Sequence, residues 1–150
     1  MSEAPEERSV TLEWRTRLGA PRARVFAALT EATQLAAWFC DAAESEPETG
    51  GRLALRWKQA RSGAMDFAGR WVHFDRPFAC AFEGSHEGHP DGHAGRVAFV
   101  LEPAGPETLL TTRHEPPDQP ECAPVIARYR DAWPRALARL AAHLSPEAPR

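Results

Sequence analysis

Apolar and polar residues alternate near the start of the chain, which predicts a strand over residues 9–18. The apolar side chains that share one face of this strand are Val10, Leu12, Trp14 and Leu18. Polar and charged residues occupy the other face, so the strand is expected to be half-buried. Gly19 and Pro21 end the strand, and Pro21 is suited to begin a short helix over residues 21–29, because proline fits the first helical turn.

A second short helix is expected directly after the first. Thr33 is placed to act as its N-cap, because a threonine hydroxyl can accept a hydrogen bond from a free amide of the first turn. The apolar side chains of this helix are Leu35, Trp38 and Phe39. The polar residues 44–51 that follow predict a loop.

The middle of the chain predicts a meander of antiparallel strands. The predicted strands are residues 50–58, 65–75, 78–84, 96–102 and 108–114. They are separated by turns at residues 76–77 and 103–107 and by a polar loop at residues 85–95.

The last third of the chain changes to a period of three to four residues, which predicts one helix over residues 124–144. Its apolar stripe consists of Ile126, Tyr129, Trp133, Leu137, Leu140 and Leu144. Pro134 interrupts the helix, because a proline there removes one backbone donor and clashes with the preceding turn at a cost of about 3 kcal/mol. A kink is therefore predicted between Tyr129 and Pro134.

The order of the elements is a strand, two short helices, several antiparallel strands and a long helix. A curved antiparallel sheet wrapped around that helix would cover every apolar face, so the predicted class is α+β. The arrangement resembles the helix-grip fold of the START and polyketide-cyclase (SRPBCC) superfamily. One domain is expected over residues 1–150, with an ordered core over residues 9–144.

Several motifs narrow the resemblance to one branch of that superfamily. They are, in chain order, APRARVFAALTEATQLAAWF at residues 20–39, GGRLALRW at residues 50–57, Gly-x-Trp-Val at residues 69–72 followed by Asp-Arg-Pro, and Trp133 with Leu137 and Leu140. As an ordered set, these motifs resemble the AHSA-type domains, the branch named after the activator of the heat-shock-protein-90 ATPase.

Size and charge exclude several classes of protein. The 150 residues fit one globular domain, and the formal net charge is -3 with the arginines scattered along the chain. No basic stripe is present, so nucleic acid is not an expected partner. The polar residues 1–9 do not resemble a secretory signal, and no segment approaches the roughly 20 apolar residues of a membrane span, so we expect a cytoplasmic protein without a membrane partner.

Aromatic side chains dominate the larger apolar residues, since the chain has five Trp and seven Phe but a single Ile. The resemblance implies a cavity between the sheet and the long helix that binds a hydrophobic or aromatic small molecule, and large flat side chains suit such a site. We expect its mouth near Tyr129 and Pro134. The aromatic residues expected to line or close the cavity are Trp38, Phe39, Trp57, Phe67, Trp71, Phe82, Phe99, Tyr129 and Trp133. The alternative is that these side chains simply fill the core.

A polar side chain inside such a cavity could orient a ligand or transfer a proton. The candidates are Asp66, His73, Glu83, Arg113 and His114. Alternation along the last strand allows only one of Arg113 and His114 to point inward, and His114 is the predicted ligand-binding residue. No Ser-His-Asp order, phosphate-binding loop or paired carboxylates is present in the sequence, so we expect neither catalytic residues nor a cofactor.

Histidine and cysteine spacing predicts no metal site or disulfide framework. His86, His89 and His93 have spacings that would suit zinc on a helix, but the glycines and the proline between them predict a solvated loop instead. The three cysteines are too few and too widely spaced for a disulfide scaffold, so we interpret Cys40, Cys80 and Cys122 as buried thiols.

These observations favour a protein that binds a hydrophobic or aromatic small molecule. Two alternatives stay open: a cyclase- or aromatase-like enzyme that uses the same cavity, and a protein-interaction role like that of the co-chaperone that names the branch. The enzyme would need an inward-facing acid-base pair. ATPase stimulation is not expected, because that co-chaperone carries an additional amino-terminal domain, whereas one domain is expected in these 150 residues. Exposed strand edges make a homodimer a further expectation.

Overall fold

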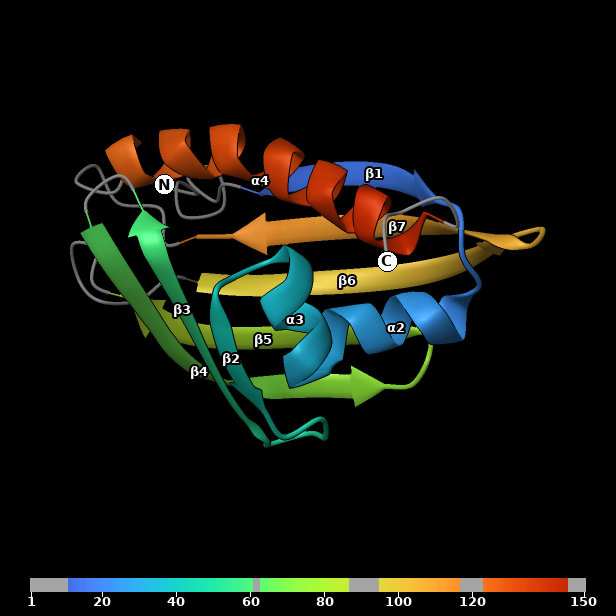
Figure 1. Ribbon diagram of the computed structural model, residues 1–150, viewed down its shortest axis with the longest axis horizontal. Coiled ribbons are helices and arrows are strands. Elements are labelled where there is room, and N and C mark those ends of the chain that lie inside the picture. Colours follow the sequence, from blue (N-terminus) through green and yellow to red (C-terminus); the bar gives the residue numbers. More distant parts are fainter. Residues whose placement is uncertain (1–10, 61–62, 87–94, 117–122, 146–150) are drawn as a thin grey trace, which may run out of the picture.

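The structure is a computed structural model that describes residues 11–60, 63–86, 95–116 and 123–145. Within these residues, a curved antiparallel sheet wraps around one long helix (Figure 1). The helices are α2 (Arg22–Thr30), α3 (Ala32–Trp38) and α4 (Ala123–Leu144). The strands are β1 (Leu12–Leu18), β2 (Ala42–Ser45), β3 (Arg52–Ala60), β4 (Gly63–Asp75), β5 (Ala79–His86), β6 (Gly95–Ala104) and β7 (Glu107–Glu115). The predicted α+β class and helix-grip arrangement are confirmed.

The strands lie in the order β1-β7-β6-β5-β4-β3-β2, and each neighbouring pair is antiparallel. From β2 to β7 the strands follow one another along the chain, so the predicted meander is confirmed. β1 lies beside β7, with Leu12 opposite His114 and Leu18 opposite Thr108. The first and last strands are therefore neighbours, a pairing that the alternation within either strand does not specify.

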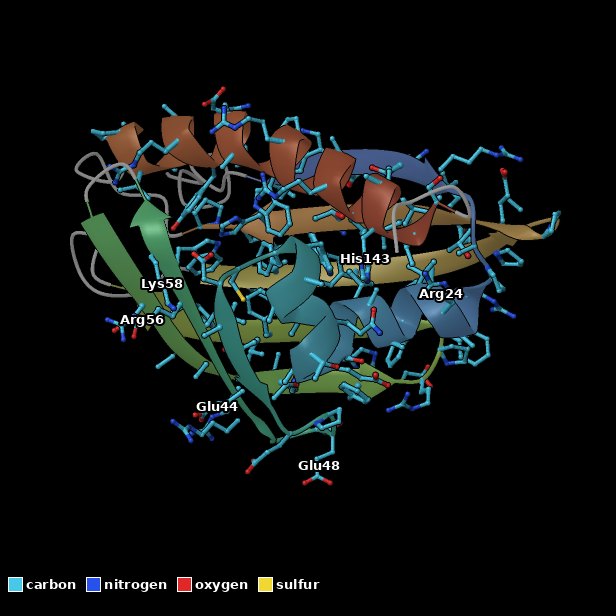
Figure 2. All side chains as sticks on the ribbon, viewed as in Figure 1. Arg24, Glu44, Glu48, Arg56, Lys58 and His143 are labelled. Carbon is cyan, nitrogen blue, oxygen red and sulfur yellow. The ribbon has the colours of Figure 1, made fainter. Side chains whose placement is uncertain are left out.

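Alternate residues of the strands face the helices, and the others face solvent. In β1, Leu12 and Leu18 are buried, whereas the charged residues between them are exposed, which confirms the half-buried strand over these residues. Val10, predicted to share the apolar face, lies outside the described residues. Figure 2 shows the charged side chains of Glu44, Arg56 and Lys58 on the outside of β2 and β3. The charges of the sheet are therefore kept away from its concave face.

One strand lies where the sequence predicts the start of a loop. β2 pairs with β3, and Ser45 lies opposite Leu53. The Ser45 hydroxyl donates a 2.6 Å hydrogen bond to the Thr30 carbonyl and accepts one of 3.1 Å from the Trp71 indole. The sequence of β2, AAES, contains no β-branched or aromatic residue and has little strand propensity of its own. Its extended conformation therefore depends on pairing with β3 and on these side-chain contacts.

The start of α3 also differs from the prediction. Its N-cap is Glu31, whose extended backbone separates α3 from α2, and Thr33 lies inside the helix. The Leu35 amide donates a 2.9 Å hydrogen bond to the Glu31 carbonyl, so helical bonding begins before Thr33 is reached. The prediction of Thr33 as N-cap is wrong for this reason, since a residue with helical neighbours on both sides cannot occupy the half-helical cap position.

α4 is one continuous helix through Pro134. Its buried residues are Val125, Trp133, Ala136, Leu137, Leu140 and Leu144, whereas Ile126 and Tyr129 are half-buried. Pro134 itself is exposed. The helix therefore does not break at this proline, and the kink between Tyr129 and Pro134 stays a prediction.

All three helices lie on the same face of the sheet (Figure 1), and the core fills the space between the two layers. Its largest fully buried side chains include Trp71, Phe26, Leu18, Leu29, Leu53 and Leu110. The Trp38 indole donates a 2.8 Å hydrogen bond to the Ala28 carbonyl and so joins α3 to α2. No helix in the described part of the chain combines the length and the apolar character that crossing a membrane requires.

Candidate functional site

Trp133 is the centre of an aromatic cluster that joins α4 to the sheet and to the end of α3. Its ring stacks on Phe39, with 5.6 Å between the ring centroids and 25° between the planes. The ring centroids of Trp14 and Phe99 each lie 6.2 Å from that of Trp133. We call these four residues, together with His114, the Trp133 cluster. One side chain of α4 thereby contacts residues from β1, β6, β7 and the residue after α3.

A second row of aromatic residues continues from this cluster across the sheet. The ring centroid of Phe82 lies 6.4 Å from that of Phe99 and 5.7 Å from that of Trp71. Phe67 meets Phe82 edge-on at 5.4 Å. On the helix side, Phe39 contacts Trp38 and Trp57 at 4.9 and 5.3 Å. The predicted aromatic site residues therefore belong to one connected network of ring contacts.

The space left inside this network is small. A residual cavity of about 10 Å³ lies between the helices and the sheet, which is the room of about one water molecule. Its lining is apolar and consists of Leu29, Leu35, Trp38, Phe39, Leu53, Leu55, Trp71, Phe82 and Phe99. The open pocket that the sequence predicts is not found in the described part of the structure, because the aromatic rings pack against one another and fill the interior.

The network is half-buried along one edge. Phe39, Trp57 and Tyr129 each remain partly exposed, whereas the rings of Trp71, Phe67, Phe82 and Phe99 are buried. Tyr129 and the exposed Pro134 do not line the residual cavity. The predicted mouth beside these two residues of α4 therefore does not lead to the space that remains, and Phe39 is the half-buried ring that borders it.

His114 points inward from β7 and is only 3% exposed. The Trp133 indole N–H donates a 3.0 Å hydrogen bond to its Nδ1 atom, and the Tyr129 ring covers it with 4.3 Å between the ring centroids. An imidazole nitrogen that accepts a hydrogen bond must carry its lone pair, so His114 is neutral and its proton lies on Nε2. The structure thus places one polar side chain of the predicted set inside the aromatic network.

The other polar candidates lie outside this interior. Arg113 is exposed and forms an ion pair with Glu13 at 3.3 Å. Asp66 and His73 are exposed, and Glu83 forms a solvent-accessible ion pair on the outer face of the sheet. They cannot supply the inward-facing partner that a cyclase-like acid-base pair with His114 would need.

Two further residues of the interior were not among the predicted site residues. Trp14 packs on Trp133, and Thr112 lies between Trp14 and Phe99 in the register of the sheet. Thr112 is fully buried, and its hydroxyl oxygen has no hydrogen-bond partner among the described residues. The alternation that places His114 inward places Thr112 on the same face, so the period of two contains the signal that would have identified it.

The histidine and cysteine predictions are only partly covered by the described residues. His89, His93 and Cys122 lie outside them, and the residues that are described contain no group of three or more His, Cys, Asp and Glu able to hold a metal ion. Cys40 and Cys80 are buried thiols, as predicted. Burial raises the pKa of the Cys40 thiol to about 11 and also raises that of Cys80, so both stay protonated at neutral pH.

A curved sheet, a long helix held against its concave face and an interior of aromatic rings together define a helix-grip protein. Solved structures share this fold. MLL2253 from Mesorhizobium loti superposes with a TM-score of 0.76 at 17% identity, covering 90% of this chain and 96% of that chain. The DynU16 crystal structure, described as a putative protein in the dynemicin biosynthetic locus, superposes with a TM-score of 0.75 at 20% identity, covering 93% of this chain and 48% of that chain.

The family is shown by the sequence itself. The family model described as Activator of Hsp90 ATPase homolog 1-like protein matches residues 19–145, which is most of the chain. The chain belongs to this family. The solution structure of the Aha1 dimer from Colwellia psychrerythraea has a TM-score of 0.73 at 17% identity, covering 91% of this chain and 97% of that chain. No curated protein matches the chain.

Proposed function

We propose that the protein binds a flat, apolar or aromatic small molecule between its helices and the concave face of the sheet. The observation that carries this proposal is the connected network of aromatic rings, which is buried over the sheet and half-buried along the edge at Phe39, Trp57 and Tyr129. The residues proposed to contact the ligand are Trp38, Phe39, Trp57, Phe67, Trp71, Phe82, Phe99, His114, Tyr129 and Trp133. Offset and edge-to-face ring contacts can be exchanged for similar contacts with a flat ligand.

Binding requires the network to open, because a cavity of about 10 Å³ holds no more than about one water molecule. Phe39 is the best-placed ring to move. It is half-buried, it follows a helix of only seven residues, and its ring lies between the residual cavity and Trp133. Rotation of Phe39 would enlarge the cavity without disturbing any strand.

The comparison with DynU16 supports a role in small-molecule chemistry, since that protein is described as a putative protein of a biosynthetic locus. The structure of the Aha1 dimer supports the further proposal that this chain also forms a homodimer. β1 and β2 are the outermost strands of the described sheet, and either would offer an edge for such a contact.

The test is a titration of the purified protein with β-methylnaphthalene, a small flat apolar probe, followed by the fluorescence of the tryptophans. We expect saturable quenching, because Trp38, Trp71 and Trp133 belong to the proposed site. Native mass spectrometry of the freshly purified protein is a parallel measurement, in which a co-purifying compound that is released on unfolding supports the proposal.

A matched pair of leucine variants makes this test specific. Leu55 lines the residual cavity, whereas Leu109 lies on the outer face of β7 and is half-exposed. We expect the larger side chain of Leu55→Phe to fill the cavity and to lower the affinity for the probe by at least about tenfold. Leu109→Phe should bind the probe with the affinity of the wild-type protein. The absence of saturable quenching in the wild-type protein, or equal losses in both variants, would contradict the proposal.

A further inference from the structure

Thr112 carries a hydroxyl group that the fold buries without a hydrogen bond. Its side chain is 0% exposed, and among the described residues its oxygen is the buried side-chain atom without a partner. The equally buried hydroxyls of Thr30 and Thr108 donate hydrogen bonds of 2.8 and 2.7 Å to the carbonyls of Phe26 and Ala20. Burial of a hydroxyl without a partner is unfavourable, so Thr112 is the exception that requires an explanation.

The surroundings of Thr112 are aromatic. Trp14 and Phe99 are its neighbours on the two adjacent strands, and the Trp133 ring packs on both of them. His114 follows two residues later on the same inward face of β7. The hydroxyl therefore lies beside the rings of the Trp133 cluster, and among the described residues it is the buried side-chain polar group without a partner.

The residual cavity and the strand position of Thr112 share one neighbour, Phe99. Phe99 lines the cavity and is also the register partner of Thr112 on β6. Phe39 lines the same cavity and stacks on Trp133, whose ring packs on both register neighbours of Thr112. Rotation of Phe39, which the proposed function already requires, together with a shift of the Phe99 ring would bring a ligand in the cavity within reach of the hydroxyl.

We propose that the Thr112 hydroxyl recognises one neutral polar substituent, a phenolic hydroxyl or a ketone oxygen, on an otherwise aromatic ligand. This inference rests on the proposed function and adds the chemical class of the ligand. A threonine hydroxyl can both donate and accept a hydrogen bond, so it can pair with either substituent. A charged substituent does not fit, because no ionised side chain among the described residues faces this interior and an unpaired buried charge is strongly unfavourable.

The experiment compares β-naphthol with β-methylnaphthalene, two probes of nearly equal shape that differ in a hydroxyl and a methyl group. Both are titrated into the wild-type protein, Thr112→Val, Thr112→Ser and Thr108→Val, with circular dichroism as the check of folding. The measured quantity is the affinity for β-naphthol divided by the affinity for β-methylnaphthalene in each protein. The difference in hydrophobicity between the probes affects this ratio equally in every protein, so a change of the ratio between variants does not come from it.

We expect the affinity for β-naphthol, relative to that for β-methylnaphthalene, to fall by about tenfold in Thr112→Val. The same relative affinity should be unchanged in Thr108→Val. Thr112→Ser, which retains the hydroxyl, is expected to keep most of the wild-type preference. If both probes bind but the ratio is the same in wild type and Thr112→Val, the inference is wrong and the proposed function stands. If neither probe binds the wild-type protein, the proposed function fails, and the inference fails with it.

Discussion

The Trp133 indole and the His114 imidazole are joined by a 3.0 Å hydrogen bond inside an apolar interior, one residue on α4 and the other on β7. The bond holds the helix in one position along the sheet, because it has a donor and an acceptor in fixed places whereas the ring contacts around it are less directional. It also keeps His114 in the neutral form with its proton on Nε2. One hydrogen bond at the centre of the proposed site thus fixes both the position of α4 and the protonation of His114.

The Trp133–His114 bond can be measured by a double-mutant cycle. Trp133→Phe keeps an aromatic ring but removes the indole N–H, and with it the hydrogen bond that Nδ1 of His114 accepts. We expect it to lower the free energy of unfolding by about 1–3 kcal/mol, with a coupling energy to His114→Leu of about 1 kcal/mol. Urea denaturation of the wild type, both single variants and the double variant provides the four values. Strictly additive losses would show that the bond contributes nothing to stability.

Thr112→Val is expected to stabilise the protein. Valine has nearly the shape of threonine and removes the hydroxyl that lacks a partner, so the free energy of unfolding should rise by about 1 kcal/mol. Thr108→Val is the matched control on the same face of β7, and it should lower that free energy by about 1 kcal/mol because its hydroxyl is bonded to Ala20. Equal changes in the two variants, measured by urea denaturation without ligand, would refute the assignment of Thr112 as unpaired.

Pro134 is expected to weaken α4. Its ring removes one backbone donor from the middle of the helix, and the side chain is exposed, so Pro134→Ala loses no core contact. We expect this variant to raise the free energy of unfolding by up to about 3 kcal/mol. Pro124 lies in the first turn of α4, where no partner for its missing amide is required, and Pro124→Ala should change stability by less than about 0.5 kcal/mol. Thermal denaturation of both variants distinguishes these outcomes, and a loss of stability in Pro134→Ala would contradict the prediction.

His143 is expected to make the fold less stable in acid. Figure 2 shows His143 beside Arg24, and the Arg24 guanidinium donates a 3.4 Å hydrogen bond to the His143 carbonyl. The Nε2 atom of the His143 ring lies 2.7 Å from Oε1 of Gln34. Burial, followed by the charge of Arg24, lowers the pKa of His143 below its usual value of about 6.5. The unfolded chain therefore binds a proton at this residue at a higher pH than the folded chain, and folding stability falls as the pH drops below about 6.5.

His143→Gln removes this titration and keeps a polar side chain next to Gln34. The free energy of unfolding is measured by urea denaturation between about pH 5 and pH 8, a range that contains the usual histidine pKa. We expect the variant to lose less stability than the wild-type protein on the acid side and to match its slope on the alkaline side. Parallel curves over the whole range would show that His143 titrates alike in both states.

Periodicity alone was sufficient for most of the fold. The change from a period of two to a period of three or four predicts the strands and α4, and the inward face of β7 follows from the alternation that includes Leu110, Thr112 and His114. The failures have local causes. β2 has little strand propensity and is held by its pairing with β3. The N-cap of α3 is set at Glu31 by the extended backbone that links the two short helices.

The sequence by itself determined which side chains face inward, because the period of a hydrophobic pattern records the side of an element that a core must cover. It also determined the family, through motifs that hold their order along most of the chain. Tertiary structure alone decided that β1 pairs with β7, that Trp133 reaches His114, and that the Thr112 hydroxyl finds no partner among the described residues. Those contacts join residues far apart in the chain, so they depend on strand register and on the position of α4. For the same reason, the closed state of the interior was not predictable, because the packing of rings from so many elements depends on where every backbone lies.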